Sequence, residues 1–190
     1  MKKNLLIALW FTLVTTVMFG VLYPLAITGL AQVLFPGRAN GQLIERNGKV
    51  VGSRIIGQAF SGPSYFHSRP SSAGTGYDPT SSGGSNLAPT NKTLIERVKG
   101  DAQKLHSENP TAPIPVDLIT SSGSGLDPDI SPAAAEFQIP RVAHSRGMKE
   151  DDVRSLVRKH TKGRDLGFLG EPRVNVLELN LELDALHALR

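Results

Sequence analysis

The sequence predicts an α+β protein in which one N-terminal transmembrane helix carries a single domain with a small sheet and about three helices. Two observations support this class. From Leu5 to Phe35 the chain contains no Asp, Glu, Lys, Arg or His, which exceeds the roughly 20 apolar residues that cross a bilayer. The rest of the 190-residue chain mixes apolar periods of two and of 3.6 residues, which indicate strands and helices. We expect an anchor over residues 1–36 and one domain over 37–190.

Two interpretations of the N-terminal segment are open, a retained anchor and a cleaved secretory signal. Lys2 and Lys3 form a basic N-terminal region, and residues 29–31 have the small side chains of a cleavage site. The apolar run over residues 5–23 is longer than the roughly 7–15 residues of a signal core. Apolar residues also continue at helical spacing beyond Pro24. The pattern therefore favours the anchor.

Charge around the span predicts its orientation. Lys2, Lys3 and the terminal amine favour a cytoplasmic N-terminus, which places the domain outside the cytoplasm. Basic residues that follow the span argue the other way, but long domains are translocated largely regardless of charge. Inside the span, Gly20 and Pro24 predict a disturbance, since proline cannot donate a hydrogen bond to the preceding turn.

Composition and motifs exclude several classes of function. The chain has 21 Lys+Arg and 17 Asp+Glu without a basic run, and 6% aromatic residues, so nucleic acid is not an expected partner. It has no Cys, which excludes disulfides and thiolate metal sites. Its five His lack metal-binding spacing, and it has no phosphate-binding G-x-x-x-x-G-K-[ST] motif. We predict no catalytic residue and no metal site.

Local signals predict several elements of the domain. Asn47 and Gly48 suit the two positive φ angles of a tight turn, so residues 42–46 and 49–56 are expected to form a β-hairpin. Thr90 or Asn91 is expected to cap a helix with apolar positions from Leu94 to Leu105.

Two more helices are expected further along the chain. Ser131 and Pro132 suit the start of the second helix, which is expected to end near Gly147. Residues 153–160 place apolar side chains on one face of the third, which is expected to end before Gly163.

Two stretches are expected to be strands. Residues 116–119 suggest a short strand after a proline-rich entry. From Val174 to Leu183 apolar residues alternate with Glu, Asn and Asp, and a period of two indicates a strand. Leu183, Leu186 and Leu189 instead fit a final helical turn.

Residues 57–89 are rich in Gly, Ser, Pro and Thr, which is typical of a disordered linker. Aromatic residues are spread through this stretch, and they are scarce in flexible linkers. We therefore expect an ordered segment of loops that forms a partner surface. The candidate interface residues are Tyr65, Phe66, Arg69, Tyr77 and Asn86.

Two clusters of Gly and Ser lie at residues 81–86 and 121–128. The second precedes the helix start at Ser131, where free N–H groups could hold an anion. Gly-Ser loops more often form turns, and the turn interpretation is favoured.

Four stretches, together with the anchor, resemble the C subunit of the bacterial Kdp high-affinity potassium-transporting ATPase. They are GPSYFHSRPS at residues 62–71, DPTSSGGSNLAPTN at 78–91, TSSGSGLDPDISPAAA at 120–135 and LGFLGEPRVNVL at 166–177. The resemblance runs nearly the length of the chain.

This resemblance implies a non-catalytic accessory subunit in the bacterial inner membrane, with its domain periplasmic or extracellular. The implied partners are the lipid bilayer, a channel-like potassium-selective A subunit, a P-type ATPase B subunit and a small F subunit. ATP and potassium are used by the complex, and the chain needs no cofactor of its own. Consistently, it lacks the Asp-Lys-Thr-Gly-Thr stretch of P-type pumps.

The resemblance also implies a role in raising the ATP affinity of the B subunit. The matching residues are Ser122, Gly123, Ser124, Gly125 and Gln138. A domain outside the membrane meets almost no ATP, so a structural role for these residues fits the expected topology better. The alternatives are a membrane-anchored nucleotide-binding module and an extracytoplasmic binding module.

Overall fold

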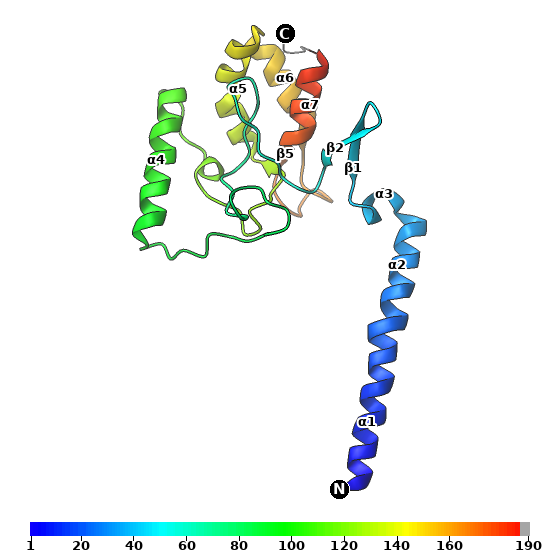
Figure 1. The fold of residues 1–190 in the computed structure, drawn as a ribbon. Coiled ribbons are helices and arrows are strands. Elements are labelled where there is room, and N and C mark those ends of the chain that lie inside the picture. Colours follow the sequence, from blue (N-terminus) through cyan, green and yellow to red (C-terminus); the bar gives the residue numbers. More distant parts are fainter. Residues whose placement is uncertain (187–190) are drawn as a thin grey trace. The chain divides into compact units, whose positions relative to one another are not determined.

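A computed structural model describes residues 1–186 of the chain (Figure 1). The chain divides into two compact units, Met1–Ile44 and Glu45–Arg190. The boundary between anchor and domain that we expected at residue 36 stays a prediction, because packing does not mark where a membrane would end.

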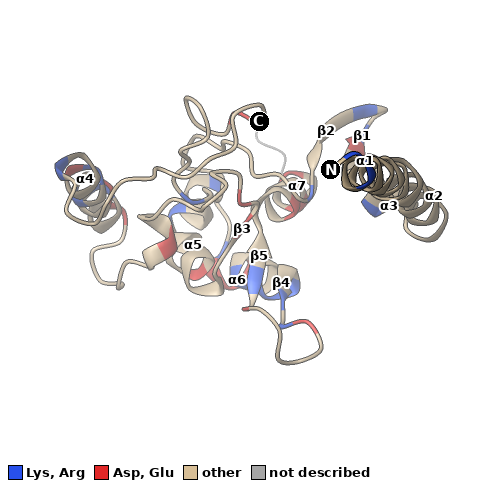
Figure 2. Cartoon of the chain, turned by 90° about the horizontal axis from the view of Figure 1, so that it is seen from below, with Lys and Arg blue, Asp and Glu red and all other residues tan. Residues whose placement is uncertain are grey.

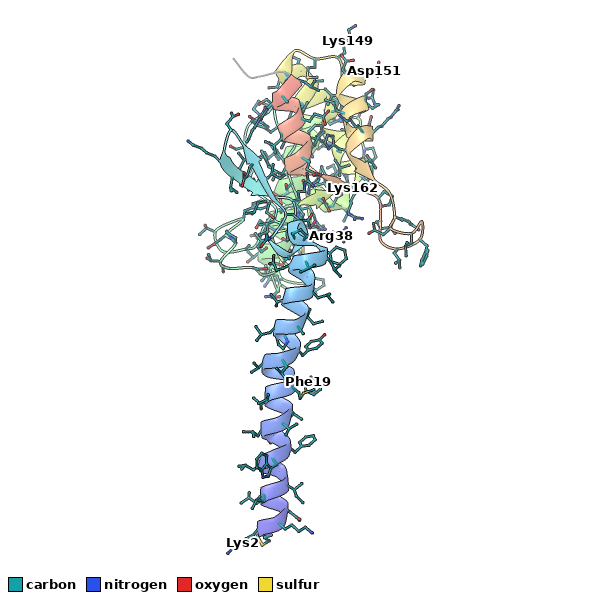
Figure 3. All side chains as sticks on the ribbon, turned by 90° about the vertical axis from the view of Figure 1, so that its right-hand side faces the viewer. Lys2, Phe19, Arg38, Lys149, Asp151 and Lys162 are labelled. Atoms are coloured by element: carbon teal, nitrogen blue, oxygen red, sulfur yellow. The ribbon has the colours of Figure 1, made fainter. Side chains whose placement is uncertain are left out.

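The first unit is mainly one long apolar helix. Residues Lys2–Leu34 are long and apolar enough to cross a membrane, and they are the one such segment among residues 1–186. Its side chains, Phe19 among them, point outward from the helix (Figure 3). Its elements are α1 (Lys2–Val17), the π-helical turn η1 (Met18–Leu22) and α2 (Tyr23–Leu34), followed by α3 (Pro36–Ala39).

The predicted disturbance of this helix takes the form of the π-helical turn. The ring of Pro24 would clash with the carbonyl of Gly20 in a regular α-helix. The wider turn is closed by a hydrogen bond from the N–H of Tyr23 to the carbonyl of Met18. The helix therefore continues through the proline.

The predicted hairpin is confirmed. Strands β1 (Leu43–Arg46) and β2 (Lys49–Ser53) pair in a two-stranded sheet. Asn47 and Gly48 have φ angles of 53° and 73°, as the tight turn requires. Strand β2 is shorter than expected and ends at Ser53.

Residues 57–89 contain no helix or strand, as predicted. We call this stretch the loop segment. Phe66 and Ala73 are fully buried, so the segment is part of the folded unit and is not a flexible linker.

Four helices and a three-stranded antiparallel sheet form the rest of the second unit. The strand order is β3-β5-β4, with Ile130 opposite Val174 and Thr161 opposite Val174. The elements are α4 (Lys92–Glu108), the 3₁₀ turn η2 (Val116–Leu118), β3 (Asp129–Ile130), α5 (Pro132–Arg146), α6 (Glu150–His160), β4 (Thr161–Lys162), β5 (Arg173–Asn175) and α7 (Val176–Leu186).

The core lies among α5, α6, α7 and β5, and Phe66 contributes to it from the loop segment. Helix α4 has no buried residue and lies apart from the other three helices (Figure 1). The α+β class is confirmed, with four helices in this unit where about three were expected.

Capping explains where the predicted helices begin. Asn91 accepts hydrogen bonds from the N–H groups of Thr93 and Leu94 at 2.9 and 3.3 Å. Ser131 accepts one from the N–H of Ala134 at 3.0 Å. These side chains satisfy amides that have no partner inside the helix.

Both strand predictions for the C-terminal half need correction. Residues 116–118 form a 3₁₀ turn. The strand expected over 174–183 ends at Asn175, whose side chain accepts a hydrogen bond from the N–H of Glu178 at 3.1 Å and so caps α7. The pattern Asn175-x-x-Glu178 is a signal for the start of a helix. The alternation of apolar and polar residues over 174–183 favoured a strand instead. Leu183 and Leu186 lie in a helix as expected, whereas Leu189 lies outside the described residues.

The helical form of α7 predicts an uneven effect of leucine substitutions. Leu179 and Leu183 are fully buried, four residues apart, while Leu181 is only partly buried. We expect L179A and L183A each to lower the free energy of unfolding by about 2–5 kcal/mol, and L181A by less. Denaturant titration of the full chain in detergent, followed by circular dichroism, measures this. Equal losses at all three positions would indicate a strand face.

Candidate functional site

Two buried carboxamides hold the backbone of the loop segment. Asn180 accepts from the N–H of Phe66 and donates to its carbonyl, both at 2.9 Å. Gln138 does the same for His67, at 2.8 and 3.1 Å. Their exposed fractions are 1% and 2%. A carboxamide offers the donor and the acceptor that one backbone residue needs. These side chains therefore make the hydrogen bonds that a neighbouring strand would make in a sheet.

Two arginines of α5 hold the preceding carbonyls. Arg141 donates through Nη1 to the carbonyls of Pro63 and Tyr65 at 2.7 and 2.9 Å. Arg146 donates through Nε to the carbonyl of Ser64 at 2.6 Å and lies over the ring of Tyr65, 5.0 Å from its centre. These charge-assisted bonds fix the path of the loop segment over α5.

The same cluster contains a half-buried histidine. The Nε2 atom of His67 lies 2.8 Å from the carbonyl of Gly62. Burial, and then the positive charge of Arg141, lowers the pKa of His67, and the hydrogen bond to the Gly62 carbonyl and then the charge of Glu108 oppose this shift. Burial also lowers the pKa of Arg141, again opposed by Glu108, whose carboxylate lies 3.1 Å from Arg141 Nε.

The Ser-Gly loop, residues 121–128, packs closely against the loop segment. Gly125 has a φ of +67°, and an added Cβ would lie 2.6 Å from the amide nitrogen of Ala73. Its carbonyl accepts from Ser71 Oγ at 2.6 Å. The carbonyl of Ser124 accepts from the N–H of Gly83 at 2.8 Å. This loop is therefore a packing element as well as a turn.

Three of the five candidate nucleotide residues, Ser124, Gly125 and Gln138, bind different parts of the loop segment. Ser124 and Gly125 bind residues 71–83, Ser122 and Ser124 lie 3.5 Å apart through their hydroxyls, and Gly123 is exposed. The carboxamide of Gln138 is bound to His67 and donates to the carbonyl of Ala134. Nucleotide binding by these residues stays a prediction.

A carboxylate of the protein itself lies at the start of α5, where the free N–H groups suggested a site for an anion. Asp117 accepts from the backbone N–H and from the hydroxyl of Ser131, at 2.8 and 3.1 Å. A negative charge at a helix N-terminus is stabilised by the helix dipole. The protein thus supplies its own anion at α5.

The candidate interface residues differ in accessibility. Phe66 requires a correction: it is fully buried in the core, so it contacts other core residues and is not available to a partner. Tyr65 is partly buried and its hydroxyl donates to Asp184 at 3.2 Å. Asn86 is exposed, with a φ of 52°.

Arg69 and Tyr77 are also partly buried and are joined to the rest of the unit. Arg69 forms an ion pair with Asp127 at 3.1 Å. The hydroxyl of Tyr77 donates to the carbonyl of Arg69, and burial raises the pKa of Tyr77. Their polar groups face neighbouring loops.

A cavity of about 610 Å³ lies beside the start of α5. Its charged lining is Arg69, Asp117, Asp127, Asp129, Glu171 and Arg173. Burial raises the pKa of Asp129, which accepts from Asn175 at 3.1 Å and lies 3.5 Å from Arg173. Residues 1–186 contain no group of three or more His, Asp or Glu side chains that could hold a metal ion.

The chain combines an apolar helix long enough to cross a membrane with an α+β domain. This combination defines the class of membrane-anchored domains. The family model described as "K+-transporting ATPase, c chain" matches residues 5–185, and the chain belongs to this family. The resemblance seen in the sequence is thereby confirmed.

Several relatives carry the name "Potassium-transporting ATPase KdpC subunit". The protein from Koribacter versatilis is 63% identical over 184 residues, covering 97% of this chain and 95% of the relative. The one from Methylobacterium nodulans is 57% identical and covers 90% and 91%. The one from Caulobacter vibrioides is 59% identical and covers 90% and 87%. All three are named as subunits of an ATPase.

The contacts of Gln138 predict that it stabilises the fold. Q138L leaves the partly buried N–H and carbonyl of His67 without their partner, at about 1–3 kcal/mol for each group. We expect a total loss of about 2–6 kcal/mol in denaturant titration. Q103L, on the exposed side of α4, is the matched control and should change stability little. Unchanged stability of Q138L with a lost effect on ATP affinity would make Gln138 a nucleotide ligand.

The two glycines of the Ser-Gly loop are predicted to differ. G125A places a Cβ against the backbone of Ala73 and Gly83 at a positive φ, so a loss of roughly 2–4 kcal/mol is expected. Around Gly123 no atom lies within 4 Å of an added Cβ, and G123A should stay within about 0.5 kcal/mol of wild type. The same titration measures both variants. A stable G125A would show that the two loops do not pack closely.

Proposed function

We propose that the chain is a non-catalytic accessory subunit that assembles or stabilises an ATP-driven high-affinity potassium uptake complex. Its partners are a channel-like A subunit, a P-type ATPase B subunit and a small F subunit. ATP and potassium are handled by these partners, and the chain carries no cofactor of its own. Membership of the potassium-transporting ATPase family supports this assignment.

One observation carries the accessory role. Gln138 and Gly125, two of the residues that could serve a nucleotide, are engaged in holding the loop segment. These two residues bind other parts of the same domain. In this way they fix the surface that other subunits would contact. Any rise in the ATP affinity of the B subunit is then an indirect effect of assembly.

The proposed location is the bacterial inner membrane, with the N-terminus in the cytoplasm and the domain periplasmic or extracellular. Lys2 and Lys3 precede the apolar helix, as the positive-inside rule requires for this orientation. A domain placed there is separated from cytoplasmic ATP, which agrees with an indirect effect.

Assembly is tested by co-purification. A tagged chain extracted in mild detergent is expected to bring with it a channel-like protein and a P-type ATPase, and the eluate to show potassium-stimulated ATP hydrolysis. A tag on an unrelated single-span protein is the control. A chain that elutes alone and monodisperse would contradict the proposal.

Orientation is tested by cysteine labelling, which is clean because the chain has no native Cys. S81C lies at an exposed position of the loop segment and is expected to react with a membrane-impermeant maleimide in spheroplasts. N4C, at the N-terminal end of α1, should react only after lysis. The reverse pattern would place the domain in the cytoplasm and favour a nucleotide-binding module.

A further inference from the structure

The loop that joins β4 to β5, residues 163–172, holds three large apolar side chains in solvent. Their exposed fractions are 83% for Leu166, 69% for Phe168 and 49% for Leu169. We call this stretch the apolar loop. It projects away from the three-stranded sheet (Figure 2). Grouped exposed apolar side chains on a folded domain mark an interaction site.

The apolar loop has a fixed conformation. Asp165 and Leu169 exchange backbone hydrogen bonds, both at 2.9 Å. Leu166 and Gly167 turn the chain with φ angles of 54° and 83°. A positive φ at leucine is unfavourable, and the backbone hydrogen bonds between Asp165 and Leu169 hold the turn in this conformation. The backbone of the apolar loop is therefore fixed before any partner arrives, which lowers the entropy lost on binding.

The charges at the base of the apolar loop neutralise each other. The Nη2 atom of Arg164 donates to both carboxylate oxygens of Glu171, at 2.8 and 3.0 Å. Arg173 lies 3.3 Å from Asp165. Nearby, Lys162 lies 3.3 Å from Glu178.

This chemistry favours a protein partner over a lipid surface. Segments that lie in the membrane interface combine apolar side chains with several Lys and Arg that are free to meet lipid phosphates. The apolar loop has one basic residue, Arg164, which already binds Glu171, and Arg173 beside the loop lies 3.3 Å from Asp165. A preformed apolar tip with an internally neutralised rim suits an uncharged apolar pocket.

We propose that Leu166, Phe168 and Leu169 dock into an apolar pocket on another subunit of the same complex. This inference rests on the proposed function, because it requires a complex, and it adds a contact outside the loop segment. The pocket accepts the ring of Phe168 as the central anchor, with the two leucines beside it.

Co-purification from cells that contain the other subunits tests the proposal. The double variant L166S/F168S should recover about tenfold less of the partner subunits than wild type. V50S removes an apolar side chain of similar exposure, 55%, in the β-hairpin, and should recover them normally. The denaturation midpoint of the double variant should be unchanged, since both side chains are exposed.

The possible results separate this inference from the proposed function. If wild type recovers no other subunit, both are overturned. If wild type and L166S/F168S recover the same amount, the docking of the apolar loop alone is overturned.

A fluorescence measurement identifies what covers the loop. F168W in a W10F background leaves one tryptophan, since Trp10 is the only native one. Its emission, taken as the difference between the F168W/W10F and W10F samples, should shift to shorter wavelength in the complex and not for the chain alone in lipid nanodiscs. A shift in nanodiscs with quenching by brominated lipid would make the bilayer the occupant and overturn the proposal. No shift in either sample would overturn it too.

Discussion

The fold of the second unit depends on one constraint: a stretch without secondary structure enters the core at Phe66, and its peptide groups there must still be paired. Buried backbone groups without a partner are costly. Asn180 and Gln138 bind the N–H and carbonyl of consecutive residues, and Arg141 and Arg146 bind the carbonyls before them. Polar residues on the buried sides of α5 and α7 are therefore required by the loop segment.

This constraint connects the fold to the family role. The loop segment and the Ser-Gly loop hold each other at glycine positions that admit no side chain, as at Gly125. A loop-rich surface becomes rigid in this way without a large sheet. Rigid loops are well suited to present side chains to other subunits, and the apolar loop is a second ordered surface on the same unit.

The sequence predicted what local chemistry determines. The hairpin at Asn47 and the helix starts at Asn91 and Ser131 were found because each signal lies within a few residues. The strand expected from Val174 failed because alternating leucines also fit one helix face, and Asn175 decides the outcome as a cap. Local signals thus located the hairpin and the helix starts, and they misjudged the two strands expected over 116–119 and 174–183.

The candidate site was less predictable, because its contacts join residues far apart. Gln138 and His67 are separated by 71 positions, and no periodicity reports such a pair. Phe66 and Tyr65 look alike as neighbouring aromatics, yet the first is buried in the core and the second faces Asp184. Only the packed structure distinguishes them.

The most direct test of this account is the amide hydrogen exchange of the full chain in detergent, measured residue by residue. Phe66 and His67 lie in a stretch without helix or strand, but their N–H groups are bound by buried carboxamides. Both N–H groups should exchange as slowly as amides of the helical core. The N–H of the exposed residue Ser82 should exchange fast. Fast exchange at Phe66 and His67 would contradict the claim that these side chains hold the domain together.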